Sequence, residues 1–451
     1  MVKREIVRKI RKILKTGKSS ELKSFLESLN HSDTARCVTD LSEKDREKLF
    51  SMLLPVDAAS VLRDLPDSQA ADVIEEMNPG KAADIVEEMP SADRVDVLHD
   101  MSENAADAIL DQMEPEEAAD ARNLLKYPEN SAGGIMLTEF FSYATDKTVQ
   151  YVLDDLKNNR DKYKQFIVQY IYVTSPAGKL EGVLKVRDLV MEHSNAGLKD
   201  IMLKNPISVN VNDGVEKLIS VFSEHNFIGL PVVDSEKKLL GIILRYRLQE
   251  AVGELTSESF LKASGIVGGE EFRSMRLSRR VFRRLSWLSI NVFLNVIAAS
   301  VIALHQDTIS AAVVLAVFLP IISDMSGCSG KQAVAVSIRE LTIGLISPAD
   351  MFMVFLKEFA VAAINGIVLG LLLASVAIMW KGNMYLGLIV GAALALNTML
   401  AAVLGGLLPL MLRKMKMDPA LASGPILTTI TDMCGFFFVL TFASWAINYI
   451  K

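Results

Sequence analysis

The sequence predicts a multidomain membrane protein with an all-α superhelical N-terminal domain, α/β tandem domains and an α-helical transmembrane domain of five spans. Three observations predict this fold class. Hydrophobic residues make up 50% of the 451 residues, a high share for a soluble protein. Charged residues are concentrated before about residue 280, whereas 285–450 carry charge only in short clusters. Two different internal repeats occupy the charged part, and such repeats predict stacked or tandem units.

Composition and motifs exclude several classes of function. The formal net charge of −6 leaves no basic face for nucleic acid, because binding to phosphates depends on counterion release. Cys37, Cys328 and Cys434 are far apart and lack metal-ligand spacing, so neither a disulfide framework nor a structural zinc site is expected. The sequence contains no Ser-His-Asp or Cys-His set, phosphate-binding loop or HExxH motif. We therefore expect a protein that is not an enzyme and does not bind nucleic acid.

The first 18 residues predict a basic amphipathic helix. This segment interleaves Lys and Arg with apolar residues and lacks the uninterrupted apolar core of a cleavable signal peptide. Ile6, Ile10, Ile13 and Leu14 fall on one helical face. That face could lie on an anionic membrane surface or pack against its own domain. Packing is the favoured interpretation, since short amphipathic helices are common at domain edges.

A twelve-residue repeat runs from residue 56 to residue 120. Leu65, Met77, Met89, Met101 and Met113 recur at this interval. The units also share an Ala pair, in most cases followed by Asp: Ala58-Ala59, Ala70-Ala71-Asp72, Ala82-Ala83-Asp84, Ala105-Ala106-Asp107 and Ala118-Ala119-Asp120. Each unit is too short to bury its own apolar face, so we expect short helices that stack into a superhelix.

The acidic residues of this array, among them Asp72 and Asp84, have two interpretations. Acidic faces are usually solvated and serve solubility. Alternatively, an acidic array repels a neighbouring acidic surface unless divalent cations lie between them, which would make the domain spacing sensitive to those cations. The pattern favours the first interpretation and leaves the second open.

A second internal repeat relates residues 135–192 to residues 201–250. Ile135-Met136-Leu137 corresponds to Ile201-Met202-Leu203, and 178–184 corresponds to 237–243. Each copy predicts an extended entry, a helix, a short strand, a turn, a second strand and a closing helix. The predicted helices are 148–157 and 214–224, and the first strands are 166–173 and 229–233.

This tandem module resembles a pair of cystathionine-beta-synthase (CBS) domains. In that family, a Gly-hydrophobic-x-x-x-x-Asp pattern ends on an acid that can bind a nucleotide ribose. Here Gly182 leads to Asp188, which follows Arg187, whereas the second copy has Arg247 at the equivalent place. The resemblance implies at most one adenine-nucleotide site, around Tyr172, Arg187 and Asp188. A structural CBS pair without a ligand is the alternative.

An arginine cluster and five apolar runs predict the membrane topology. Six arginines lie in 273–284, directly before the first apolar run, and the positive-inside rule places that end in the cytosol. Each run is long enough to cross about 30 Å of hydrocarbon. The predicted spans are 285–304, 310–338, 351–380, 384–412 and 421–450. Five spans put the N-terminus in the cytosol and the C-terminus outside the cell membrane.

Two of these spans contain polar residues. In the second, Pro320 is followed by the polar, glycine-rich segment 323–332, which predicts a break in the helix at bilayer depth. The last span opens with Gly424-Pro425 and brings three threonines and Asp432 within about two turns. An intramembrane carboxylate costs about 2.5–3.5 kcal/mol and by default marks an ion or proton route. The alternative is that Asp432 pairs with a buried base, Lys331 or Lys357.

The whole arrangement resembles the MgtE family of magnesium channels and transporters. The most specific local pieces are Tyr-Pro-Glu-Asn-Ser-Ala-Gly at 127–133 and Gly-Pro-x-x-Thr-Thr-x-x-Asp at 424–432. The resemblance implies four parts: an acidic helical-repeat cytosolic domain at 1–128, tandem CBS domains at 129–252, a connecting (plug) helix at 253–284 and a pore domain of five helices at 285–451.

The resemblance also implies a homodimer whose pore carries Asp432 from both subunits. Mg²⁺ sheds water reluctantly and is often held through its waters, so two carboxylates with oxygen neighbours can select it. The implied helpers are Thr428, Thr429 and the backbone of the broken helices at Gly424 and Gly327. Opposed carboxylates repel each other, which favours a dication between them.

The family's gate is understood as cytosolic Mg²⁺ that bridges acidic surfaces and closes the pore. The candidate sensor carboxylates are Glu216, Glu250, Glu254, Glu258, Asp72 and Asp84. This sequence departs from the family in two places: Arg245 and Arg247 stand where the second CBS copy tends to end in acids, and Cys328 and Lys331 lie in the second-span motif. The first departure predicts altered magnesium feedback, and the second affects ion preference.

We therefore expect a magnesium channel or transporter of the cell (inner) membrane that carries Mg²⁺ into the cytosol, with ATP or another adenine nucleotide as a further ligand. Three alternatives stay open. The same architecture could carry Mn²⁺ or Co²⁺ with Cys328 as a soft ligand. A membrane-anchored adenylate sensor would transport nothing. A proton-coupled carrier would depend on the pH gradient.

Overall fold

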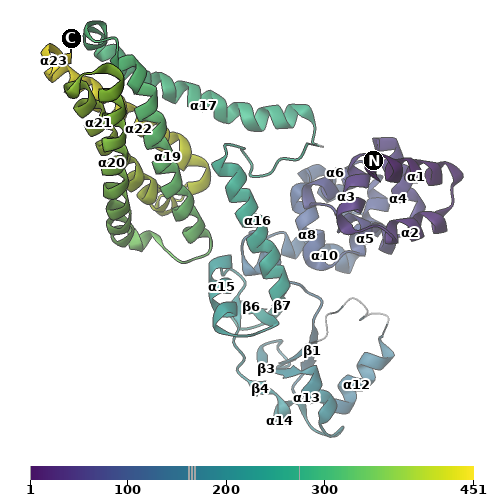
Figure 1. Ribbon diagram of the computed structural model, residues 1–451. Coiled ribbons are helices and arrows are strands. Elements are labelled where there is room, and N and C mark those ends of the chain that lie inside the picture. Colours follow the sequence, from purple (N-terminus) through teal and green to yellow (C-terminus); the bar gives the residue numbers. More distant parts are fainter. Residues whose placement is uncertain (1, 161–162, 164–165, 167–168, 274, 451) are drawn as a thin grey trace. The chain divides into compact units, whose positions relative to one another are not determined.

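The computed structural model describes the chain except residues 1, 161–162, 164–165, 167–168, 274 and 451. It consists of two compact units, Met1–Ala251 and Val252–Lys451. The first unit contains a helical array and two small sheets, and the second contains long helices (Figure 1).

The N-terminal array consists of short helices whose packing follows the twelve-residue repeat. Helices two places apart pack together, α5 on α7, α6 on α8 and α7 on α9. The alanine pairs of α5, α6 and α7 are buried, which lets the helices approach closely. The helices are α1 (Val2–Thr16), α2 (Ser19–Glu27), α3 (His31–Thr39), α4 (Glu43–Met52), α5 (Pro55–Leu62), α6 (Asp67–Glu75), α7 (Pro79–Glu87), α8 (Ser91–Asp100), α9 (Glu103–Leu110) and α10 (Pro115–Leu124). The predicted stack of short helices is confirmed.

The first helix packs on its own domain. Ile10, Ile13 and Leu14 are buried in the core of the array, and Ile6 packs at its edge. The favoured interpretation of the N-terminal amphipathic face is therefore confirmed.

The tandem module forms two sheets of matching design. In the first, β1 (Phe141–Ala144) runs parallel to β2 (Tyr170–Thr174), which pairs antiparallel with β3 (Leu180–Lys185). The short strand β4 (Leu203–Lys204) pairs antiparallel with the other edge of β3. In the second, β5 (Val209–Asn210), β6 (Gly229–Val233) and β7 (Leu239–Leu244) repeat this pattern, with a bulge at the equivalent place. The helices are α11 (Ala132–Ile135), α12 (Val149–Asn158), α13 (Val186–Met191), α14 (Leu198–Ile201) and α15 (Val215–Glu224). The predicted strand 166–173 includes 167–168, which lie outside the described residues.

The two copies exchange their entry segments. Leu203, which opens the second copy, pairs with Val183 of the first sheet, and Leu137, which opens the first copy, bridges to Ile242 of the second sheet. This exchange joins the copies, because each sheet is completed by its neighbour's entry.

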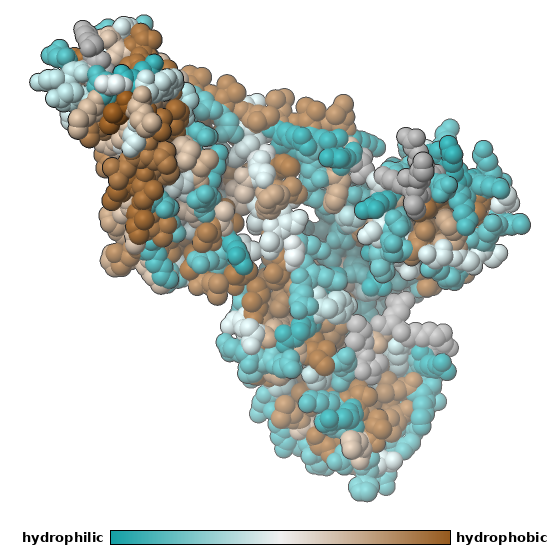
Figure 2. All heavy atoms as spheres, in the orientation of Figure 1, coloured by the Kyte–Doolittle hydropathy of each residue, from teal (hydrophilic) through white to brown (hydrophobic). Residues whose placement is uncertain are grey.

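Long helices make up the second unit. Helix α16 (Arg245–Ala263) begins in the first unit and continues into the second. The long helices are α17 (Leu277–Leu304), α19 (Leu315–Thr342), α20 (Met351–Lys381), α21 (Met384–Lys414) and α22 (Pro419–Trp445), and α18 (Gln306–Ala311), η1 (Pro348–Asp350) and α23 (Ile447–Ile450) are short. Hydrophobic side chains gather over α20 to α22 (Figure 2). Among the described residues, four helices, α17, η1 with α20, α21 and α22, are long and apolar enough to cross a membrane.

The predicted second span corresponds to α19, which is not one of those four apolar helices. Its 28 residues are long enough to cross a bilayer at 1.5 Å per residue, but the polar stretch lowers its hydropathy. The predicted break at 323–332 is wrong, because α19 is continuous through this segment. One of its two glycines serves packing instead: Gly330 lies against the backbone of α21 at Ala401.

The predicted break at Gly424-Pro425 is also wrong. Helix α22 runs through both residues, although Pro425 removes one backbone donor from the helix. The hydroxyl of Thr429 donates a hydrogen bond to the carbonyl oxygen of Pro425, one turn earlier, at 2.8 Å. A continuous helix here still places the threonines and Asp432 on successive turns.

Candidate functional site

Helix α22 positions the intramembrane carboxylate. The Asp418 side chain caps its start by accepting hydrogen bonds from the backbone N–H groups of Ala420 at 2.9 Å and Leu421 at 3.2 Å. Burial opposes the charge of Asp418, but hydrogen bonds from Lys262 and from these backbone groups hold its pKa below the usual range. Capping fixes the start of the helix, and thereby the height at which Asp432 projects.

Asp432 lies among polar side chains from two neighbouring helices. Its carboxylate is 9% exposed and accepts a hydrogen bond from the hydroxyl of Ser323 on α19. Asn397 of α21 donates to the carbonyl oxygen of Thr431 at 3.0 Å. Among the residues that the structure describes, the hydrogen-bond partner of the Asp432 carboxylate is the Ser323 hydroxyl, and Lys331 attracts its charge from beyond ion-pair distance.

The threonines of α22 are partly committed to their own helix. Thr428 donates to the carbonyl oxygen of Gly424 at 3.0 Å, and Thr429 donates to that of Pro425 at 2.8 Å. Each hydroxyl oxygen keeps lone pairs that can accept from a water molecule or face a cation. Gly424 and Gly327 border open space, since a Cβ added at either would meet no atom within 4 Å. Gly327 is nevertheless buried and Gly424 is half-buried, so the open space lies beside these residues, and their backbone is not itself exposed.

One face of α19 is polar and uncovered. Its exposed residues recur at helical spacing along the length of the helix, whereas Ser326, Gly330 and Ser337 face the bundle. The exposed polar members are Asp324, Cys328, Lys331, Gln332 and Arg339. Charged side chains at membrane depth almost always face protein or water rather than lipid. We call these five residues the polar face of α19.

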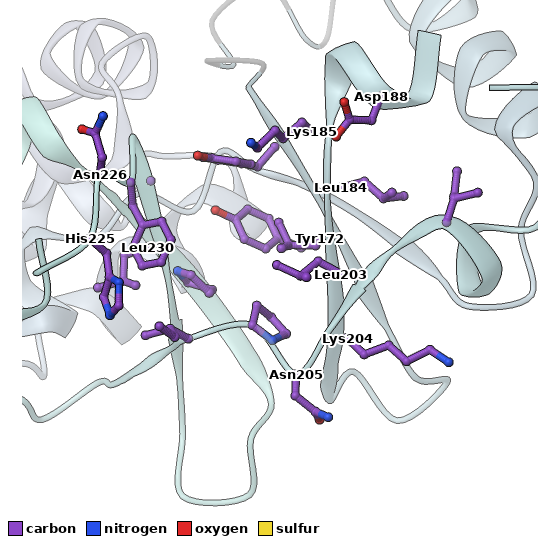
Figure 3. Close-up of a pocket in the computed structure, with 18 of the residues that line it drawn as sticks. Tyr172, Leu184, Lys185, Asp188, Leu203, Lys204, Asn205, His225, Asn226 and Leu230 are labelled. Atoms are coloured by element: carbon purple, nitrogen blue, oxygen red, sulfur yellow. The ribbon is translucent and has the colours of Figure 1, made fainter. Parts of the chain in front are cut away.

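A cavity between the two CBS copies contains two of the three predicted nucleotide residues. It has a volume of about 680 Å³, and Tyr172 and Asp188 line it. Figure 3 shows them with Lys185 of the first copy around the same space as His225 and Asn226 of the second copy. Arg187 is not a lining residue; its guanidinium contacts the Asp188 carboxylate at 3.1 Å.

The chemistry of this cavity fits an adenine nucleotide. Tyr172 is 1% exposed, and its buried hydroxyl has no hydrogen-bond partner among the described residues. Burial raises the pKa of Tyr172, so the group stays a neutral donor. Lys185 and Lys204 supply positive charge, and Asp188 supplies an acceptor for a ribose hydroxyl. Sequence reasoning missed Lys204, which lies at the cavity through the exchange of entry segments, and His225, which directly follows α15.

The predicted sensor acids are spread over the surface. Glu216, Glu254 and Asp84 are exposed. Asp72, on α6, is half-buried; Glu250 contacts Arg247 at 3.3 Å. Within the described ranges, no three His, Cys, Asp or Glu side chains come together in a way that could hold a metal ion. One chain therefore contains no preassembled cage from these acids.

Glu258 belongs to a charged contact between α16 and the start of α22. Lys262 Nζ lies 2.6 Å from Glu258 Oε1 and 2.9 Å from Asp418 Oδ2. Burial opposes the charge of Lys262, but hydrogen bonds to both carboxylates raise its pKa. The contact ties α16 to the N-terminal cap of α22, the helix that carries Asp432.

Comparison with known proteins places three family models on this chain. The model of the divalent cation transporter MgtE matches residues 319–442, that of the MgtE intracellular N domain matches 7–130, and that of the CBS domain matches 198–254. The magnesium transporter MgtE of Enterococcus faecalis is 31% identical over 335 residues, which are 74% of this chain and 73% of that protein. MgtE of Bacillus subtilis is 28% identical over 95% of this chain and 94% of that protein.

A solved structure resembles slightly more than half of this chain. The crystal structure of the soluble part of a magnesium transporter is 29% identical, with a TM-score of 0.50, and the match covers 56% of this chain and 99% of that one.

Proposed function

Because the chain belongs to the MgtE family of divalent cation transporters, we propose that it carries Mg²⁺ through the cell membrane into the cytosol. The observation that carries the proposal is Asp432, a buried carboxylate on a membrane helix whose described partner is the hydroxyl of Ser323. A carboxylate is costly in lipid, so its presence on a membrane helix by default marks an ion or proton pathway. The relatives that are named magnesium transporters support Mg²⁺ as the cargo.

The polar face of α19 supports a homodimeric pore. A single chain leaves this face uncovered at membrane depth, where lipid contact would be costly. A second copy that meets the first across this face would enclose a water-filled passage and bring two Asp432 carboxylates near the axis. Two opposed carboxylates favour a dication, and the oxygens of Thr428 and Thr429 would face its water shell. The space beside Gly424 and Gly327, where an added Cβ would meet no atom within 4 Å, is room that such a shell could use.

The proposed topology places the N-terminal unit in the cytosol and the C-terminus outside. The arginines of 273–284 support this orientation through the positive-inside rule. We place the regulatory Mg²⁺ among Glu216, Glu250, Glu254, Glu258, Asp72 and Asp84. Since one chain does not preassemble a cage from them, the ion would bind only where two acidic surfaces approach each other.

Mg²⁺ uptake into liposomes that contain the purified chain tests the proposed function. We expect uptake well above that of protein-free liposomes, unchanged by collapse of a pH gradient, and reduced when Mg²⁺ is high on the cytosolic face. Faster transport of Mn²⁺ or Co²⁺ than of Mg²⁺ would favour the soft-ion alternative, for which the exposed Cys328 is the candidate ligand. Nucleotide binding with no metal uptake would favour the sensor alternative.

We propose that the cavity between the CBS copies binds an adenine nucleotide, with Asp188 at the ribose and Lys204 near the phosphates. Replacing Asp188 by Ala should weaken binding of ATP or AMP about tenfold, since a hydrogen bond to a charged group contributes about 1.5–3 kcal/mol. Isothermal titration calorimetry on the full chain measures this. Glu192→Ala is the matched control, because Glu192 is an exposed acid that does not line the cavity. Equal weakening in both variants would contradict the assignment.

A further inference from the structure

Arg247 places a guanidinium between the helical array and the second CBS copy. Its side chain is 14% exposed, and its Nη1 and Nη2 atoms lie 2.9 Å from Asp93 Oδ1 and 2.8 Å from Asp96 Oδ2. Both acids belong to α8 of the array, whereas Arg247 lies in the first turn of α16, which follows the last strand of the CBS pair. Arg63 of the array also reaches Asp93, at 3.0 Å.

Beside Arg247, the helical array and the CBS pair contact each other directly through hydrogen bonds and apolar packing. The backbone N–H and hydroxyl of Ser91 donate to the two oxygens of the Glu139 carboxylate, both at 2.7 Å. The backbone N–H of Thr138 donates to the Ser91 hydroxyl at 3.0 Å. Ala92 is buried against Leu137 in an apolar cluster of the CBS pair. Hydrogen bonds and apolar burial thus surround the charged contact.

Without the Arg247 guanidinium the contact would carry excess negative charge, because Arg63 opposes only part of it. Asp93 and Asp96 lie one helical turn apart and are largely buried, and Glu250 adds a third carboxylate on the other side. Burial raises the pKa of Asp96, and the charge and hydrogen bond of Arg247 act in the opposite direction. Removing one partner of a buried ion pair leaves an uncompensated charge, which is strongly destabilising.

We infer that Arg247 is a fixed cation that holds the acidic array on the second CBS copy at every magnesium concentration. A guanidinium that is part of the chain has the same local concentration whether cytosolic Mg²⁺ is scarce or plentiful. Magnesium regulation of the proposed transport then does not act through this contact. The inference rests on the proposed function only in that last point, because docking of the array is a property of the chain itself.

Hydrogen exchange of α8 in the purified full chain tests the inference. In wild type, exchange of the α8 amides should agree within about twofold between EDTA and saturating MgCl₂, since the contact needs no ion. In Arg247→Asp, exchange in EDTA should be faster by about tenfold or more, because the introduced carboxylate joins those of Asp93, Asp96 and Glu250. Saturating MgCl₂ should restore protection in this variant, since the dication takes the place of the guanidinium.

The matched control is Lys199→Asp. It makes the same charge change at an exposed residue of the CBS pair and should leave α8 exchange as in wild type in both solutions. Wild-type protection that requires Mg²⁺ would overturn the inference, even if Arg247→Asp fails to fold. So would wild-type protection of Arg247→Asp in EDTA. Failure of Mg²⁺ uptake in liposomes would reject the proposed function and leave the exchange result standing.

Discussion

Replacing Asp432 by Ala is expected to reduce Mg²⁺ uptake by at least about a hundredfold. Loss of a charged partner in a poorly solvated site costs on the order of 3 kcal/mol, and the proposed pore loses one carboxylate from each subunit. Asp432→Asn should be nearly as severe, because the amide keeps the shape and loses the charge. Ser323→Ala should lower uptake only a few-fold, since the hydroxyl orients the carboxylate but does not carry its charge.

Uptake of Mg²⁺ into liposomes, normalised to the amount of folded protein, measures these effects. Asp307→Ala is the control, because this acid lies on the short helix α18 between two long helices. Size-exclusion chromatography of each variant separates loss of transport from loss of fold. Wild-type uptake by Asp432→Ala would refute the assignment of this residue to the ion pathway.

Local periodicity predicts much of this fold because the elements that it describes are local. The twelve-residue repeat predicts the short helices of the array, since each unit exposes an apolar face that only its neighbours can cover. Asp432 is conspicuous in the sequence for a similar reason: a carboxylate in an apolar run has a known cost. Both predictions depend on residues within a few turns of each other.

Contacts between distant segments are not visible in local patterns. The partners of Arg247 on α8 lie about 150 residues earlier, so the sequence shows only that a base replaces an expected acid. Lys204 reaches the cavity between the CBS copies because the entry of the second copy pairs with the first sheet. The glycines of 323–332 predict a break in the helix, whereas the structure shows that one of them, Gly330, packs against the partner helix α21.

The contact between α20 and α21 leads to the second prediction. Gly370 and Gly391 face each other there: a Cβ added at either would lie 2.6 Å from the carbonyl oxygen of the other. Real Cβ atoms do not come this close to a backbone oxygen, so the two helices can approach this closely only because both facing residues are glycine. Gly391→Leu is expected to destabilise the membrane unit by about 3 kcal/mol or more, since neither backbone can move aside without separating the helices.

Thermal unfolding in detergent measures the effect. For a unit of this size, a loss of about 3 kcal/mol lowers the unfolding midpoint by about 6–12 °C. Ala392→Leu is the matched control, because this neighbouring residue on α21 is exposed and the same side chain adds no clash with α20. A pore variant such as Asp432→Ala should unfold near the wild-type midpoint, so the two variants separate transport from packing. An unchanged midpoint in Gly391→Leu would mean that α20 and α21 do not pack with their backbones in contact.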